Sequence, residues 1–202
     1  MCVLATMDIK NAFNTPGWNK ILLEAEERGM LRKLLTFLGK YPGDRKIIVH
    51  NIGGRVKRNV FAGASQGSII GLLLWNMVYD GLLRKLQDIP YLNAALFADD
   101  LSLIFDMAKQ EEITERLGRT MNTATRRCLV NGLNIVQEET EVILITGKRI
   151  PKIMEINMGG YFLRTKLEVG YLGVQLDNRR RFCAHFENVC GNADELMGVY
   201  IL

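Results

Sequence analysis

Apolar and polar positions alternate along the chain with two different periods, which predict a mixture of strands and helices. Residues 3–9 (VLATMDI) are mostly apolar and include a single carboxylate near their end, which is typical of a buried strand. Helical spacing of apolar residues recurs farther along the chain, and it predicts helices over 18–30, 31–41, 68–86 and 109–131. The apolar residues of 68–86 lie almost all round the helix, so this helix is expected to be buried.

The remaining segments predict hairpins and short strands. Residues 45–51 and 55–61 are separated by Ile-Gly-Gly and predict one hairpin, and residues 96–105 predict a second. Two strands are expected at 132–136 and 140–146, followed by shorter strands up to residue 177 and a last amphipathic segment. This order predicts an α+β fold, a split β-α-β antiparallel sheet of the ferredoxin-like kind with helices on one face.

Composition places the chain among globular proteins. Its 202 residues are 48% hydrophobic and 24% charged, which suits a domain with a real core and excludes a disordered chain. No apolar run approaches the ~20 residues that span a bilayer, so no membrane partner is expected. The N-terminus does not have the pattern of a secretory signal peptide. Because Met1 runs straight into apolar, strand-like sequence, we expect the chain to begin in the middle of a domain.

The four cysteines are scattered and include no C-x-x-C pair. In an intracellular protein this pattern indicates free thiols. Cys183, His185 and Cys190 would form only a partial zinc site, because a fourth ligand and the usual spacing are missing.

Basic residues gather in clusters although the net charge is only +4. Such clusters fit contacts to phosphate groups, and solvated loop ends are the alternative interpretation. The clusters are Arg55 with Lys57 and Arg58; Arg126 with Arg127; Lys148 with Arg149 and Lys152; and Arg179 to Arg181.

Two adjacent aspartates, Asp99 and Asp100, stand in the middle of the apolar stretch LFADDLSLIF. A turn would by itself explain them, because aspartate is common in turns. Asp8, however, ends another apolar strand, and neighbouring strands would bring all three carboxylates together. Such a cluster is costly to bury without cations, and hard oxygen ligands favour Mg²⁺. Two such ions roughly 4 Å apart would support an in-line phosphoryl displacement.

Five segments in order resemble the successive motifs of reverse transcriptases, most closely those of non-LTR (LINE-type) retrotransposons. The five span nearly the whole chain, and their combination is far more specific than any one alone. They are MDIKNAFN, GASQGSIIGLLLWNMVYDGLL, FADD, GLNIVQEETEVILIT and GYLGVQLD.

The resemblance assigns roles to the residues that match these motifs. Asp8 and Asp99 would hold two Mg²⁺ ions, with Mn²⁺ as an alternative, and Asp100 would be an accessory carboxylate. Phe13 would be the steric gate that collides with a ribose 2′-OH, and an ordinary core aromatic is the alternative.

Two further motifs match positions that would contact the substrates. Gln66 and Gly67 would lie near the incoming nucleotide and the template, where glycine permits close backbone approach, or would simply begin a helix. Tyr171, Leu172 and Gly173 would form the hairpin that grips the primer end, and a plain strand is the alternative.

Several positions depart from the family's pattern. Only seven residues precede Asp8, so the fingers subdomain is expected to be missing. Ser65 and Leu72 stand where proline is usual, and Gly170 replaces a lysine. Glu139 stands where a lysine commonly protonates the leaving pyrophosphate, and a carboxylate there would repel a triphosphate.

The resemblance implies a reverse transcriptase palm over 1–177, with the start of a thumb or connecting helix over 178–202. It implies an RNA template, a DNA primer, deoxynucleoside triphosphates and the remainder of a larger polyprotein as partners. The site of action would be the nucleus, after synthesis in the cytoplasm. A catalytically dead nucleic-acid-binding remnant is the alternative. A nucleotidyl cyclase shares the two-metal logic but leaves Gln-Gly-Ser and Tyr-Leu-Gly unexplained.

Overall fold

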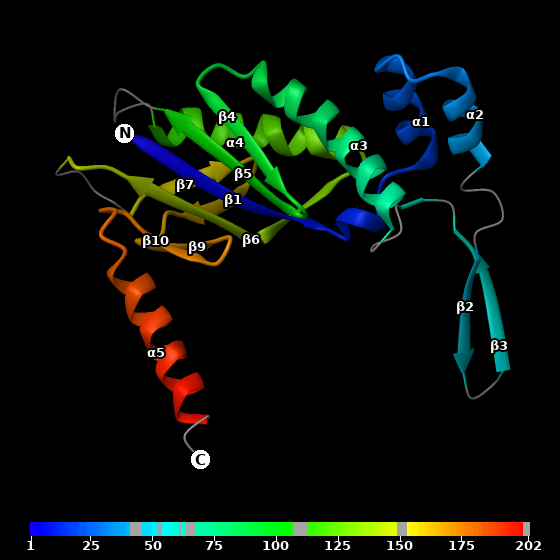
Figure 1. The fold of residues 1–202 in the computed structure, drawn as a ribbon. Coiled ribbons are helices and arrows are strands. Elements are labelled where there is room, and N and C mark those ends of the chain that lie inside the picture. The colour runs from blue at the N-terminus through cyan, green and yellow to red at the C-terminus, as the bar shows by residue number, and fades with distance from the viewer. Residues whose placement is uncertain are drawn as a thin grey trace.

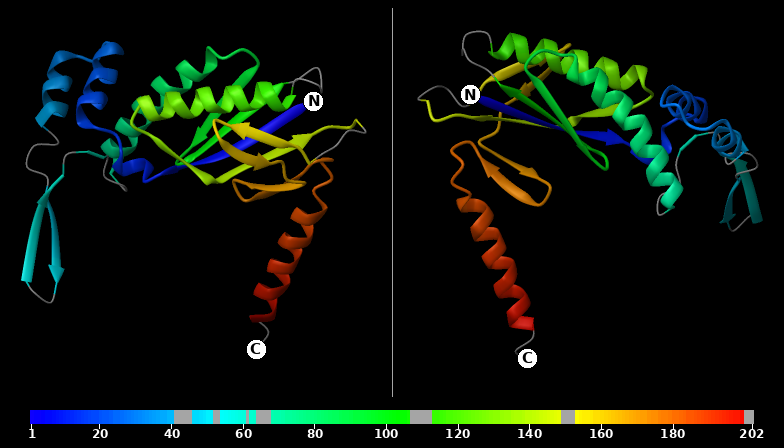
Figure 2. Two further views of the ribbon diagram at one scale, coloured as in Figure 1. Left: turned by 180° about the vertical axis from the view of Figure 1, so that it is seen from behind. Right: turned by 45° about the horizontal axis from the view of Figure 1, so that its top comes forward.

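A computed structural model describes residues 1–40, 46–51, 54–60, 62–63, 68–106, 113–148 and 153–199 (Figure 1). Its centre is a four-stranded antiparallel sheet with strand order β4-β5-β1-β6. Helices α3 and α4 cover one face of this sheet in both orientations of view (Figure 2). These elements are β1 (Cys2–Lys10), β4 (Leu92–Phe97), β5 (Asp100–Asp106), β6 (Asn134–Ile145), α3 (Ile69–Gln87) and α4 (Ile113–Val130). The predicted α+β sheet with helices on one face is therefore confirmed.

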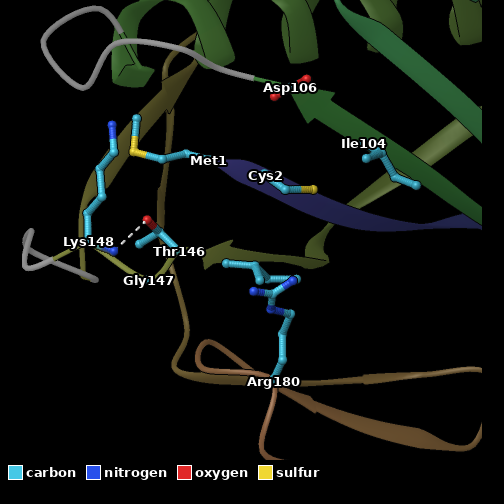
Figure 3. Close-up of a pocket in the computed structure, with 9 residues that line it drawn as sticks. Met1, Cys2, Ile104, Asp106, Thr146, Gly147, Lys148 and Arg180 are labelled. Carbon is cyan, nitrogen blue, oxygen red and sulfur yellow. Dashed lines mark hydrogen bonds between the residues drawn. The ribbon is translucent and has the colours of Figure 1, made fainter.

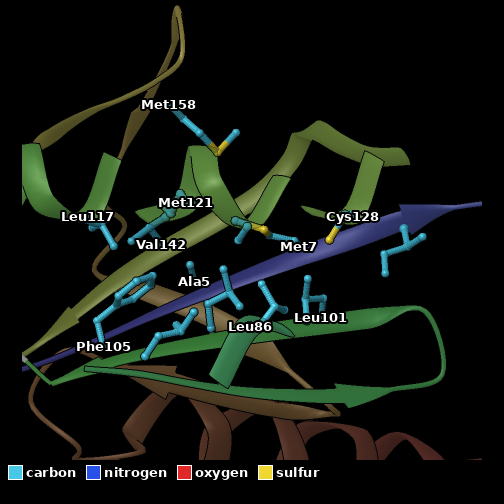
Figure 4. Packing of buried hydrophobic residues seen from close by; sticks show 14 of the residues in the cluster. Ala5, Met7, Leu86, Leu101, Phe105, Leu117, Met121, Cys128, Val142 and Met158 are labelled. Carbon is cyan, nitrogen blue, oxygen red and sulfur yellow. The ribbon is translucent and has the colours of Figure 1, made fainter. Parts of the chain in front are cut away.

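Alternation along β1 divides the sheet into a helix-covered face and a second face. Val3, Ala5, Met7 and Ile9 point into the main core, where each is at most 1% exposed. Residues of α3 and α4 spaced three and four apart fill the other side of that core (Figure 4). These residues are Trp75, Tyr79, Leu82, Leu86, Leu117, Met121, Ala124 and Cys128. The intervening residues of β1, Asp8 among them, consequently belong to the second face.

Two further helices pack on the outer side of α3. They are α1 (Trp18–Glu27) and α2 (Arg32–Lys40). Arg28, just after α1, forms an ion pair of 2.6 Å with Asp80 and donates a hydrogen bond of 2.8 Å to the Met77 carbonyl. A separate apolar cluster joins the three helices through Trp18, Ile21, Ala25, Leu38, Leu74, Met77 and Val78.

The other elements are short strands and a terminal helix. Strands β2 (Lys46–Asn51) and β3 (Gly54–Asn59) form an isolated two-stranded ribbon. The later elements are β7 (Glu155–Met158), β8 (Tyr161–Arg164), β9 (Glu168–Tyr171), β10 (Val174–Asp177) and α5 (Cys183–Val199). Within the described residues, no helix is long and apolar enough to cross a membrane.

One predicted pair of strands is in fact a single strand. The segments expected at 132–136 and 140–146 both belong to β6, which pairs with β1 along its length. The register shifts in between, because Asp8 lies opposite Val136 whereas Thr6 lies opposite Glu141. The Thr140 hydroxyl donates a hydrogen bond of 3.1 Å to the Val136 carbonyl and closes this bulge. The polar residues that suggested a break are thus accommodated as a bulge.

Candidate active site

The sheet brings the three predicted aspartates to one end. Asp8 of β1 lies directly opposite Asp100 of β5, so both side chains belong to the same face. The Ile9 N–H donates a hydrogen bond of 3.1 Å to the Asp99 carbonyl, which ties the neighbouring turn to the end of β1. Residues more than ninety positions apart in the sequence are therefore neighbours in the fold.

The turn between β4 and β5 determines how the two adjacent aspartates differ. Phe97 pairs with Asp100, which leaves Ala98 and Asp99 as a two-residue hairpin loop. Ala98 adopts a left-handed conformation with a φ of 53°. Asp99 is consequently exposed at the tip of the hairpin, whereas Asp100 is the half-buried first residue of β5.

Burial and the neighbouring carboxylates make Asp8 harder to ionise. Burial raises the pKa of Asp8 above its ordinary value, and the charges of Asp99, Glu139 and Asp100 raise it further. A hydrogen bond from the Ile9 N–H acts in the opposite direction. Glu139 reaches this site from the bulge of β6, so its negative charge belongs to the same electrostatic environment.

A divalent cation would relieve this repulsion, and oxygen ligands of this kind are those that Mg²⁺ prefers. Among the described residues, however, no group of three or more His, Cys, Asp or Glu side chains is arranged to hold a metal ion. The fold brings the three aspartates to one place without closing their side chains around a common position.

Phe13 follows the end of β1 and is held by an aromatic stack. It lies in a short 3₁₀ helix, η1 (Ala12–Asn14), that begins after the left-handed Asn11. Its ring stacks on Trp75 of α3, with ring centroids 4.8 Å apart and an interplanar angle of 27°. Trp75 in turn meets Tyr79 edge to face at 3.8 Å. The ring of Phe13, the candidate steric gate, thus packs on the buried face of α3.

The backbone of η1 is fixed from a second direction. A Cβ atom added at Gly63 would lie 2.9 Å from both the Phe13 carbonyl oxygen and the Asn14 Cα, so the chain passes η1 where only glycine fits. The Gly63 N–H donates a hydrogen bond of 2.9 Å to the Pro16 carbonyl. The position of Phe13 is therefore constrained by both its backbone and its ring.

The sequence predicts only that the helix containing Trp75 is buried, and Trp75 itself is 1% exposed. Its contact with Phe13 joins segments sixty-two positions apart, and no local pattern in the sequence reveals it. The spacing of Trp75 and Tyr79 was the one available signal, because residues four apart share a helix face. Burial raises the pKa of Tyr79, and the charges of Cys128, Asp99 and Asp8 add to this effect.

Gln66 and Gly67, the predicted nucleotide-binding pair, lie outside the described residues. The helix that they were expected to precede begins at Ile69, with Ser68 as its N-cap. The Ser68 hydroxyl accepts a hydrogen bond of 2.9 Å from the Gly71 N–H. The start of this helix is confirmed, and the role of the Gln-Gly pair stays a prediction. The expectation that the helix is buried almost all round is wrong for its first turns, because Ile69, Leu72 and Leu73 are 91%, 55% and 55% exposed.

The Tyr171-Leu172-Gly173 segment forms the turn of the β9–β10 hairpin. Tyr171 pairs with Val174, and Leu172 and Gly173 both have positive φ angles, of 47° and 80°. This hairpin packs beneath β1 and β6 on the face away from α3 and α4, through a cluster of Leu4, Ile143 and Val169 (Figure 1). It therefore shares the sheet face to which Asp8 belongs.

Asp177 organises the basic segment after β10. Its carboxylate accepts backbone hydrogen bonds from Arg179, Arg181 and Phe182. Burial raises the pKa of Asp177, but these hydrogen bonds and the Arg181 charge outweigh it and hold the pKa below its ordinary value. The predicted arginine cluster thus lies in a turn that the Asp177 carboxylate holds by hydrogen bonds.

A cavity of about 560 Å³ lies at the opposite end of β1, where Cys2 pairs with Asp106 (Figure 3). Lys148 and Arg180 contribute positive charge to its wall. The cavity is separate from the candidate active site, because the aspartates lie at the other end of β1.

All four cysteines are free thiols. The Nδ1 atom of His185 accepts a hydrogen bond of 3.4 Å from the backbone N–H of Gln175.

The chain is similar in sequence to one known family and to individual proteins of retrotransposable elements. The sequence model of one family, described as "Reverse transcriptase (RNA-dependent DNA polymerase)", matches residues 1–176. A putative 115 kDa protein of the type-1 retrotransposable element R1DM of Drosophila melanogaster is 26% identical over 93% of this chain. A Pol polyprotein from the type-1 retrotransposable element R1 of Bradysia coprophila is 28% identical over 95%. The chain spans 18% and 19% of these two relatives, about a fifth of their length.

The fold resembles that of solved telomerase structures. Apo telomerase from Candida tropicalis superimposes with a TM-score of 0.60 over 88% of this chain and 31% of its own, at 10% identity. A Candida albicans telomerase in complex with a fragment of telomeric RNA gives a TM-score of 0.53 at 13% identity. At such identities the likeness shows the palm-type fold alone.

Proposed function

Because the chain belongs to the reverse transcriptase family, and its relatives are retrotransposon proteins, we propose that it forms the catalytic palm of a metal-dependent RNA-directed DNA polymerase. The observation that carries this proposal is the pairing of Asp8 with Asp100 beside the turn that holds Asp99. The substrates would be an RNA template, a DNA primer and deoxynucleoside triphosphates. The chain would act as part of a larger polyprotein.

The proposed reaction is an in-line displacement at the α-phosphorus of the nucleotide. The primer 3′-hydroxyl gives up its proton to solvent, and its oxygen forms the new bond to the α-phosphorus. The bond between the α-phosphorus and the oxygen that bridges to the β-phosphorus breaks, and pyrophosphate leaves with that electron pair. Asp8 and Asp99 would hold two Mg²⁺ or Mn²⁺ ions, and Asp100 would supply an accessory carboxylate. The ions would stabilise the attacking and leaving oxygens. Burial and then the repulsion by neighbouring carboxylates raise the pKa of Asp8, and bound cations would offset that repulsion.

The remaining candidates would select and position the substrates. Phe13, fixed by Trp75, would exclude the 2′-OH of a ribonucleotide. Gln66 and Gly67 would contact the nucleotide and the template. The turn at Tyr171, Leu172 and Gly173 would hold the primer end on the sheet face of Asp8.

We also propose the division into a palm over 1–177 and the start of a thumb over 178–202. Helix α5 begins just after the turn that Asp177 organises and projects from the sheet (Figure 1). A nuclear site of action, after synthesis in the cytoplasm, follows from the proposal, because a retrotransposon copies itself into genomic DNA.

Metal binding tests the site without requiring a complete polymerase. Mn²⁺ titrated into the protein and followed by electron paramagnetic resonance should bind the wild type. Asp99→Asn should weaken this binding by at least about tenfold, as expected when a coordinating group is lost. Asp106→Asn removes a carboxylate from the other end of the same strand and should leave binding unchanged. Equal binding by Asp99→Asn and the wild type would contradict the site.

A catalytically dead nucleic-acid-binding remnant is the second candidate, and Glu139 is the observation that favours it. Its charge adds to the repulsion at Asp8, and it would also repel a triphosphate. Glu139→Lys separates the two candidates in a primer-extension assay with Mg²⁺. A site that is otherwise sound should gain activity, whereas a remnant should stay inactive. Glu138→Lys, a neighbour that is also exposed, is the matched control for the change of net charge.

A further inference from the structure

The ribbon of β2 and β3 sorts its side chains into two chemically different faces. Cross-strand partners share a face, so the pairs Ile48 with Lys57 and His50 with Arg55 lie on one side. Lys46 lies on the same side, because it is two residues from Ile48. We call this the cationic face, and it consists of Lys46, Ile48, His50, Arg55, Lys57 and Asn59.

The opposite side is largely apolar. It carries Ile47, Val49, Val56 and Arg58, and the three apolar side chains are 56%, 52% and 46% exposed, respectively. Arg58 is therefore separated from Lys57, its neighbour in the sequence, by the full thickness of the ribbon. The basic cluster recognised in the sequence is thus divided between two faces, with most of its charge on one.

Within the ribbon, no carboxylate balances the charges of Arg55 and Lys57. Neither strand contains an aspartate or a glutamate. Arg55 and Lys57 are exposed, and within the described part of the chain neither forms an ion pair. A concentrated positive potential of this kind attracts a polyanion.

The ribbon stands on one side of the candidate active site and α5 on the other. Both project to the same side of the sheet in Figure 1, and the ends of β1 and of the β4–β5 hairpin lie between them. The left view of Figure 2, seen from behind, also shows these strand ends between the ribbon and α5. If the primer end is held at the β9–β10 turn, the product duplex leaves past α5. The template must then arrive from the side of the ribbon.

We propose that the cationic face of the β2–β3 ribbon binds the phosphate backbone of the single-stranded template before it reaches Asp8. This inference rests on the proposed function. Arg55 and Lys57 are two residues apart on one strand, which spaces them by about 7 Å. That spacing is of the same order as the distance between successive phosphates of an extended strand. Contacts to phosphate fix the position of a strand without reading its sequence, as copying any template requires.

The test compares Lys57→Gln with Arg58→Gln. The two variants lose the same charge at adjacent positions on opposite faces. The affinity for a fluorescently labelled single-stranded RNA is measured by anisotropy over a series of salt concentrations. Each lost phosphate contact lowers the slope of log K against log salt by about 0.7 for a single strand. Lys57→Gln should therefore bind roughly fivefold more weakly at about 0.1 M salt, whereas Arg58→Gln should match the wild type.

Further measurements make the result decisive. Lys57→Arg should restore the affinity, and circular dichroism should show all variants folded. Equal losses in Lys57→Gln and Arg58→Gln would overturn the proposal, because the effect would then be one of net charge. If Lys57→Gln lost affinity only for a blunt RNA–DNA duplex, the proposal would also be overturned. The same holds if the wild type does not bind single-stranded RNA. RNA binding that depends on Lys57, in a protein whose Asp99→Asn variant binds Mn²⁺ as tightly as the wild type, would refute the proposed function alone.

Discussion

Trp75 is the residue that connects the hydrophobic core to the candidate nucleotide gate. Its ring is 1% exposed and stacks on Phe13, which is itself only partly buried. A buried aromatic of this size leaves a large cavity when it is truncated, and neighbouring side chains relax into that space. The position of the Phe13 ring therefore depends on Trp75.

Trp75→Leu is expected to weaken the discrimination between deoxynucleotides and ribonucleotides. The ratio of kcat/KM for the two nucleotides should fall by about tenfold, equivalent to ~1.4 kcal/mol in the difference between their transition-state energies. Trp18→Leu removes a buried tryptophan from the separate cluster of α1 and α2 and should leave the ratio unchanged. Equal losses with both nucleotides in Trp75→Leu would show that Trp75 has only a structural role.

Residue types predicted which carboxylates the fold would bring together, and the reason lies in the strands that carry them. Asp8, Asp99 and Asp100 stand out because carboxylates interrupt otherwise apolar strands, and the strand pairing brings them together. The support of Phe13 by Trp75 and Gly63 could not be predicted, because it joins segments that meet only through the tertiary fold.

At the scale of the element, α4 depends on one close approach to the β7–β8 hairpin. A Cβ atom at Gly118 would lie 2.2 Å from the backbone carbonyl oxygen of Asn157. Backbone of this kind cannot move aside as a flexible side chain does. The absence of a side chain at this position lets α4 pack directly on β7.

Gly118→Ala is therefore expected to destabilise the protein by about 1–3 kcal/mol through overpacking. Gly191→Ala is the matched control in α5, where an added Cβ atom would meet nothing within 4 Å. That control should stabilise its helix by roughly 0.5–1 kcal/mol. Urea unfolding midpoints measure both changes. A neutral Gly118→Ala would contradict the close packing of α4 on β7.

The stability of the turn before α5 should depend on pH, because the Asp177 carboxylate accepts its hydrogen bonds. Its pKa is lowered in the folded protein, so its contribution to stability is present above the ordinary value of 3.8. That contribution is lost as the pH falls through the lowered value. At neutral pH, Asp177→Ala should speed hydrogen exchange in the first turn of α5. Its difference from the wild type should disappear in acid, and a difference independent of pH would contradict the role of the carboxylate.

At the scale of the whole molecule, hydrophobic periodicity was sufficient to predict the sheet and the helices that cover it. It failed at β6, because the polar residues that form a bulge also look like the end of a strand. It also could not separate Lys57 from Arg58, since only the register of β2 against β3 assigns them to opposite faces. Pairing between distant segments is the information that local patterns lack.

The central claim is that the three aspartates form the metal-dependent centre of a template-directed DNA polymerase. Primer extension on an RNA template with Mg²⁺ tests this most directly, in the larger polyprotein of which the chain is proposed to be a part. The wild type should add deoxynucleotides, and Asp99→Ala should lower the rate by at least about a hundredfold. Asp106→Ala should retain the rate, since its carboxylate lies at the far end of β5. Extension by Asp99→Ala at the wild-type rate would contradict the account.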